Sequence, residues 1–173
     1  MEPRDLLVDY ERVDVNDPVL IVAFRGWNDA GEAATSAATH LGGQWSAQKI
    51  GSIDPEEFYD FQSVRPQVEL EAGMTRKIVW PANEFWVARP PQRDVILLVG
   101  SEPNTHWRMF CDVILSVARD HKVGFVITLG ALLADIPHSR PVHITGTAVD
   151  TELIRRLGLE RSRYEGPTGI VGV

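Results

Sequence analysis

Short apolar runs alternate along this chain with segments of helical periodicity. The runs at 19–24, 94–100 and 123–130 are continuous and rich in valine, isoleucine and leucine. Such runs are typical of strands buried on both faces of a parallel sheet. Between them, segments 29–41 and 104–121 carry apolar residues at the helical spacing. Strands that alternate with helices in this way predict a layered α/β domain.

Four more segments extend this prediction. Residues 44–53 and 142–148 have the pattern of further strands, the second of them buried, and residues 5–13 have that of an edge strand. A last helix is expected to begin after Asp150, a preferred capping residue, and to end at Gly158. We expect one domain over 1–173, with three layers (α/β/α) and a mostly parallel mixed sheet.

The stretch 67–88 has a different pattern and predicts a small β-rich insertion within that domain. Polar and apolar residues alternate over 67–80, with Ala72-Gly73 at the centre, which indicates an antiparallel hairpin. Residues 84–88 are expected to pair alongside it.

Candidate functional residues follow the predicted strands, because α/β folds bind ligands at the carboxyl ends of their strands. Four loops qualify, at 25–29, 100–104, 130–140 and 145–150, and the first three carry the candidate residues. Their polar side chains form the candidate pocket: Arg25, Asn28, Asp29, Glu102, Asp135, His138 and Arg140.

Each of these loops has a structural alternative to a chemical role. Asp29 precedes a helix and is preferred as its cap, with Glu32 placed to complete a capping box. In the loop 100–104, Ser101 or Asn104 is expected to cap the next helix, and Glu102 is a candidate general acid or a hydrogen-bond partner for a ribose. Asp135, His138 and Arg140 form a candidate group for proton transfer and anion binding, or else a polar, proline-stiffened surface loop. No metal or cofactor is expected, because the chain has neither a Walker motif nor a G-x-G-x-x-G motif, nor histidines at the spacing of a metal site.

The composition and charge of the chain exclude several classes of protein and of binding partner. The net charge is -7 without a block of lysine or arginine, which argues against binding nucleic acid or anionic membranes. No apolar run approaches the roughly 20 residues that cross a bilayer. A single cysteine excludes an internal disulfide framework. These features predict a soluble cytoplasmic protein.

The end of the sequence, Gly166-Pro-Thr-Gly169 before Ile-Val, resembles a turn that opens another element, so we expect a longer domain truncated at its C-terminus.

Several segments resemble the proteasome assembly chaperone 2 family, and most closely its actinobacterial branch. They are VLIVAFRGWNDAGEAA, ITLGALLADIPHSRPV, TGTA and YEGPTGIVGV, which together run from Pro18 to Val173. The resemblance implies a fold similar to phosphorylase and hydrolase domains, a homo-oligomer in the form of a trimer, and proteasome subunits as partners. Bacterial members often carry an ATP-grasp-like label, for which this sequence offers no nucleotide motif.

Two functional hypotheses follow. The first is an assembly-chaperone-like or protein-interaction protein without catalysis, in which aromatic residues anchor interfaces. Its candidate anchors are Trp27, Trp80, Phe85 and Trp86. The alternative is a phosphorylase- or hydrolase-like enzyme that binds a nucleoside or a phosphorylated small molecule at the strand ends. We favour the first, because the candidate pocket lacks a recognisable catalytic motif.

Overall fold

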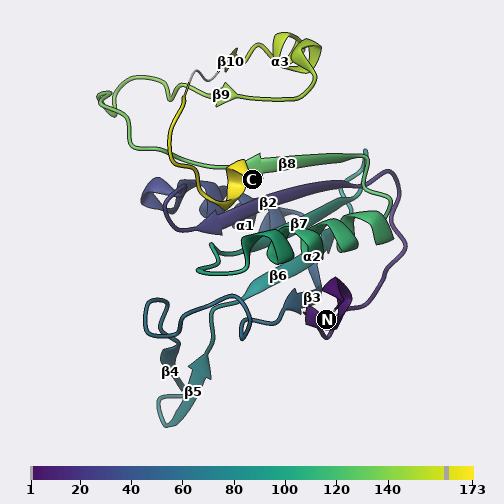
Figure 1. Ribbon diagram of the computed structural model, residues 1–173, viewed down its shortest axis with the longest axis vertical. Helices are drawn as coiled ribbons and strands as arrows, with labels where there is room; N and C mark the ends of the chain where they lie inside the picture. The colour runs from purple at the N-terminus through teal and green to yellow at the C-terminus, as the bar shows by residue number, and fades with distance from the viewer. Residues whose placement is uncertain (1, 162–163) are drawn as a thin grey trace. The chain divides into compact units, whose positions relative to one another are not determined.

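The structure is a computed structural model that describes residues 2–161 and 164–173 (Figure 1). The chain divides into two compact units. The first comprises Met1–Leu132 together with Thr168–Val173, and the second comprises Leu133–Pro167.

The first unit is built on a six-stranded sheet in the order β1-β3-β6-β7-β2-β8. Its strands are β1 (Leu7–Val8), β2 (Val19–Arg25), β3 (Gln48–Ile53), β6 (Asn83–Ala88), β7 (Val95–Ser101) and β8 (Phe125–Leu129). Strand β2 runs parallel to both of its neighbours, β7 and β8. The pairs β1–β3, β3–β6 and β6–β7 are antiparallel. The sheet is therefore mixed, as expected, but it contains more antiparallel pairing than the sequence pattern predicts.

Helices cover both faces of this sheet. Because side chains alternate along a strand, Leu20, Val22 and Phe24 of β2 point to one face and pack against α2 (Trp107–Asp120). On the other face, Ala23 packs against Ala34 and Ala38 of α1 (Ala33–Gln44). The first unit thus has the three layers and the α/β class that the sequence predicts.

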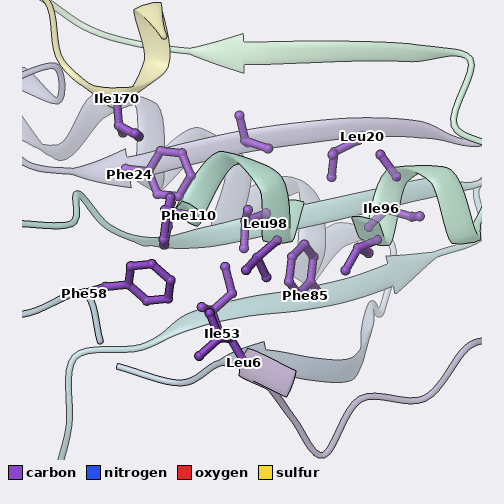
Figure 2. Close-up of a cluster of buried hydrophobic side chains, with 14 of the residues drawn as sticks. Leu6, Leu20, Phe24, Ile53, Phe58, Phe85, Ile96, Leu98, Phe110 and Ile170 are labelled. Atoms are coloured by element: carbon purple, nitrogen blue, oxygen red, sulfur yellow. The ribbon is translucent and has the colours of Figure 1, made fainter. Parts of the chain in front are cut away.

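The larger core lies between the sheet and α2 (Figure 2). Phe110 of α2 is fully buried there and meets the rings of Phe24 and Phe58 edge to face, at centroid distances of 5.6 and 5.2 Å. Short 3-10 turns lie at the margins of the fold: η1 (Pro3–Leu6), η2 (Ala30–Glu32) and η3 (Ile170–Gly172). Ile170 of η3 is buried and joins the same core.

The predicted hairpin is present as β4 (Gln67–Glu71) and β5 (Thr75–Val79), which form a two-stranded sheet of their own (Figure 1). The expectation that 84–88 pairs alongside it is wrong. Strand β6 instead lies between β3 and β7 in the main sheet. The physical reason is burial: Phe85 and Val87 belong to the core that α2 covers, which the exposed hairpin does not offer them.

The strand expected to be buried at 123–130 is an edge strand. It forms β8, which pairs with β2 and leaves Phe125 and Val126 exposed. Its continuous apolar run resembles that of a central strand, and sequence periodicity alone does not distinguish the two. The first helix also differs from its predicted end, since α1 continues through Gly42 and Gly43 to Gln44. A Cβ at Gly42 would lie 3.1 Å from Leu97, so this glycine allows close approach of helix and sheet.

The second unit contains β9 (Thr145–Gly146), α3 (Thr151–Leu157) and β10 (Glu160–Arg161), with β9 and β10 paired in parallel. Helix α3 forms where predicted. The Asp150 carboxylate accepts a hydrogen bond from the Glu152 amide at 2.9 Å, and Gly158 ends the helix in the left-handed conformation. Where a buried strand was expected at 142–148, the structure has the shorter strand β9, and Val142 is exposed.

Candidate functional site

Strands β2 and β7 end side by side, and the turns that follow them form the candidate site of the first unit. Arg25 and Ser101 are partners in the last register position of the two strands. The amide of Glu102 then donates to the Arg25 carbonyl at 2.8 Å, which places Glu102 beside the turn 26–29. We call Trp27, Asn28, Glu102, Gly169 and Ile170 the strand-end cluster.

Asp29 caps the first helix, as the structural alternative predicted. Its buried carboxylate accepts hydrogen bonds from the amides of Ala34 and Thr35 at 2.8 and 3.3 Å, and from the Thr35 hydroxyl at 2.5 Å. Glu32 does not close a capping box, because it adopts the left-handed conformation at the junction of η2 and α1. The carboxylate of Asp29 is therefore committed to the helix.

Glu102 is likewise occupied by backbone donors. Its Oε1 atom accepts from the Ile170 amide at 2.7 Å, and its Oε2 atom lies 3.4 Å from the Trp27 amide. Gly26 makes this approach possible: a Cβ there would lie 2.9 Å from Glu102 Oε2, and its φ of 143° disfavours other residues. Glu102 thus holds the C-terminal segment against the turn after β2.

Asn28 connects the same turn to two other segments. Its carbonyl accepts from the Ala131 amide at 2.7 Å, and the Ala131 carbonyl accepts from the Ala30 amide at 3.0 Å. The side-chain Oδ1 atom of Asn28 is buried against Gly169 and has no hydrogen-bond partner among the described residues. The turn therefore holds the chain immediately before the second unit and, through Glu102, the segment immediately after it.

The C-terminal segment fills the position where an α/β fold offers a ligand crevice. Ile170 is buried beside Phe24, close to the end of β2 (Figure 2). Around it, Gly169 contacts Asn28 and Glu102. Arg25 is left exposed, and the Trp27 side chain is 55 % exposed. The carboxylates of Asp29 and Glu102 are thus bound to the chain's own backbone, and the exposed side chains of Arg25 and Trp27 form the surface at this turn.

The remaining pocket candidates lie in the second unit. Asp135, His138 and Arg140 are exposed, and the Arg140 amide donates to the Pro137 carbonyl at 3.0 Å within the loop. Within the first unit, only Arg25, Asn28, Asp29 and Glu102 are brought together. A shared pocket of all seven candidates stays a prediction.

The four candidate interface aromatics differ in exposure. Trp27 and Trp80 are 55 % and 47 % exposed, and Trp86 is half-buried. Trp80 also meets the Phe61 ring edge to face at 4.9 Å. Phe85 is fully buried between the sheet and α2, so it is a core residue and is not an exposed interface anchor. Its place in a central strand, which the sequence pattern did not predict, explains the error.

One buried polar group near the strand ends has no clear signal in the sequence. The Tyr59 hydroxyl donates to the Ser101 carbonyl at 2.5 Å and accepts from the side-chain amide of Asn83. Burial raises the pKa of Tyr59 to about 12, so the phenol stays protonated at neutral pH. The Tyr59 hydroxyl is therefore paired and uncharged, whereas the buried Asn83 Oδ1 atom has no hydrogen-bond partner among the described residues.

Other chemically capable side chains lie elsewhere in the described part of the chain. Among the described residues, no three histidine, cysteine, aspartate or glutamate side chains are placed to hold a metal ion. Cys111 lies half-buried on α2, where burial raises the pKa of its thiol. A shallow hollow of about 160 Å³ is lined by Leu6, Glu57, His106 and Met109. The ring Nδ1 of His106 lies 2.8 Å from the Glu57 carbonyl there.

The substitution Gly169→Ala tests whether the strand-end cluster holds the C-terminal segment. Its Cβ would overlap Asn28 Oδ1 and lie 2.6 Å from Glu102 Oε1, so the Asn28 and Glu102 side chains that hold the segment have to move. We expect a loss of about 1–3 kcal/mol in the free energy of unfolding, measured by urea denaturation. Gly124→Ala is the matched control, because nothing lies within 4 Å of its Cβ. Equal stability of both variants would contradict the proposed contact.

The chain is similar to a known protein family and to several solved structures. A family model described as the PAC2 family matches residues 23–173. A PAC2 family protein from Streptomyces avermitilis is 47% identical, with a TM-score of 0.84 over 90% of this chain and 67% of that chain. A proteasome-assembly chaperone homologue from Mycobacterium tuberculosis is 49% identical, with a TM-score of 0.81 over 89% of this chain and 66% of that chain. No functionally curated protein matches significantly.

A more distant structure shares the fold alone. An archaeal homologue of a proteasome-assembly chaperone from Pyrococcus furiosus is 16% identical, with a TM-score of 0.59 over 95% of this chain and 66% of that chain. The chain thus spans about two thirds of the length of these solved relatives. Across the residues that the structure describes, no helix is both long enough and apolar enough to cross a membrane.

Proposed function

Because the chain belongs to the PAC2 family, we propose that it is an assembly-chaperone-like protein that binds proteasome subunits. Support comes from a relative that is 49% identical and is described as a proteasome-assembly chaperone homologue. We extend the proposal to a homo-oligomer, in the form of a trimer, that works in the cytoplasm. The family resemblance supports both of these points.

The proposal rests on one observation, namely which residues occupy the carboxyl ends of strands β2 and β7. In an α/β enzyme this edge of the sheet binds the substrate. Here Ile170 is buried at that edge, and the Glu102 carboxylate accepts its amide. Beside them, the Trp27 side chain is 55 % exposed. An exposed tryptophan on a turn fixed by hydrogen bonds is a favourable anchor for a protein partner, because tryptophan is enriched in interface hot spots.

The proposal predicts that Trp27→Ala weakens binding to proteasome subunits. The purified chain is mixed with individual proteasome subunits, and binding is measured by pull-down and then by titration. We expect the variant to bind at least about 30-fold more weakly, which corresponds to the roughly 2 kcal/mol of a hot-spot residue. Phe125→Ala is the control, since Phe125 is 42% exposed on the edge strand β8, away from the turn.

Two outcomes contradict the proposal. One is that the folded chain captures no subunit. The other is that nucleosides, nucleotides or phosphate raise its melting temperature specifically, which would favour the enzyme alternative because a ligand of the native state stabilises it.

A further inference from the structure

The β4–β5 hairpin has an apolar face that the described residues of the chain do not cover. In its antiparallel register Val68 lies opposite Ile78, and Leu70 lies two positions along β4 on the same face. Val68, Leu70 and Ile78 are 61%, 63% and 55% exposed, respectively. The sequence alternates over these strands as it does in strands with one buried face, yet the expected cover is missing.

The hairpin also lacks support at its edges. It forms a separate two-stranded sheet, so β4 and β5 each have one edge without strand pairing among the described residues. A two-stranded hairpin alone is marginally stable in water. Exposed edges of this kind are templates for pairing with another chain. Both features indicate that the hairpin is completed by a partner strand.

The charges on the two strands indicate which strand this is. On the polar face, strand β4 carries Glu69 and Glu71 and strand β5 carries Lys77, whereas Arg76 lies opposite Leu70 on the other face. The polar face is therefore acidic along β4 and basic at Lys77 of β5. Within one hairpin, Glu69 already lies opposite Lys77, which is a favourable cross-strand pairing. The same complementarity recurs when β4 of one copy meets β5 of another.

We propose that the hairpin is a self-assembly arm in which β4 of one copy pairs edge to edge, antiparallel, with β5 of the next copy. This inference rests on the homo-oligomer of the proposed function and assigns its contact surface. The chain carries a net charge of -7, so copies repel each other in general, and the local match of acidic and basic strands directs them to this contact.

This pairing has consequences for the shape of the assembly. It joins two different surfaces, so it is heterologous, and repeating it around a rotation axis closes a ring. Antiparallel alternation is preserved around such a ring, and the faces with Val68, Leu70 and Ile78 adjoin one another. Closure leaves no free edge and covers the Val68, Leu70 and Ile78 side chains, with Arg76 beside them on the same face. Trp80, one residue beyond β5, is exposed at the base of the same hairpin.

The first test measures the oligomeric state of the full chain by light scattering after size-exclusion chromatography. We expect an oligomer, and we expect Leu70→Asp to convert it to monomers. Gln67→Asp is the matched control: it adds the same charge to the same strand, on the opposite face, and should leave the oligomer intact. Circular dichroism should be unchanged in both variants, because neither residue belongs to the core.

The second test identifies which strands meet. Two tagged copies, both with Cys111→Ala, carry one new cysteine each: Glu69→Cys or Glu71→Cys in one, and Lys77→Cys in the other. Mild oxidation of the mixture should give disulfides between differently tagged copies in preference to disulfides between like copies.

The outcomes separate this inference from the proposed function. A monomeric wild-type chain overturns both the homo-oligomer and the arm. An oligomer that survives Leu70→Asp overturns the arm alone. Disulfides between two copies with Glu69→Cys indicate a face-to-face contact of hairpins and overturn the edge-to-edge pairing.

Discussion

Phe110→Ala is expected to lower the free energy of unfolding by about 3–5 kcal/mol, as is typical for removal of a fully buried aromatic ring. Phe110 is 0% exposed and contacts the rings of both Phe24 and Phe58. Phe24 lies on β2 and Phe58 precedes the hairpin, so the three rings join α2 to segments far away in the sequence. Loss of the Phe110 ring leaves a cavity that the packed sheet and helix fill only in part.

Urea denaturation followed by circular dichroism measures this change. Leu115→Ala is the control on the same helix, because Leu115 is 41% exposed and should cost less than about 1 kcal/mol. A loss for Phe110→Ala no greater than that of the control would mean that the aromatic cluster does not form as described.

The sequence predicted the parts of the fold that depend on local pattern. The strands at 19–24 and 94–100 are β2 and β7, and the helix at 104–121 contains α2 with Phe110 on its buried face. These predictions are correct because continuous apolar runs and helical spacing are properties of neighbouring residues. The predicted start of this helix at residue 104 is wrong: α2 begins at Trp107, because His106 adopts the left-handed conformation with φ 52°.

The position of each strand within the sheet could not be predicted in the same way. Strand β6 lies at the centre and β8 at the edge, although the run of β8 is the more apolar of the two. Which strands become neighbours depends on contacts between distant residues, such as Phe85 opposite Leu98. Burial follows from that arrangement, which explains both the buried Phe85 and the exposed Phe125.

The candidate site was predicted in part. The turn at 25–29 and Glu102 were identified because they follow buried strands, and the capping role of Asp29 follows from its place before a helix. The partner of Glu102 was not predictable, since the Ile170 amide lies 68 positions further along the chain. The polar contact between Tyr59 and Asn83 was missed for a similar reason, because it links residues 24 positions apart.

Gly100→Ala should be the most damaging of the glycine substitutions near the strand ends, with an expected loss of about 3 kcal/mol in the free energy of unfolding. Gly100 is buried in β7 opposite Phe24 of β2. A Cβ there would overlap Asn83 Oδ1 and lie 2.5 Å from the Ala82 carbonyl oxygen. A backbone carbonyl cannot rotate away as a side chain can, so β6 and β7 must separate locally.

That separation also disturbs the contacts of the strand ends. Asn83 donates to the Tyr59 hydroxyl, which donates to the Ser101 carbonyl directly after Gly100. The next residue, Glu102, holds the Ile170 amide, so we expect Gly100→Ala to weaken subunit binding through the Trp27 turn as well. Gly43→Ala is the control, because its Cβ meets nothing within 4 Å, and in a helix alanine is favoured over glycine by about 1 kcal/mol. If urea denaturation gives Gly100→Ala the stability of the wild type, the close packing of β6 against Gly100 is wrong.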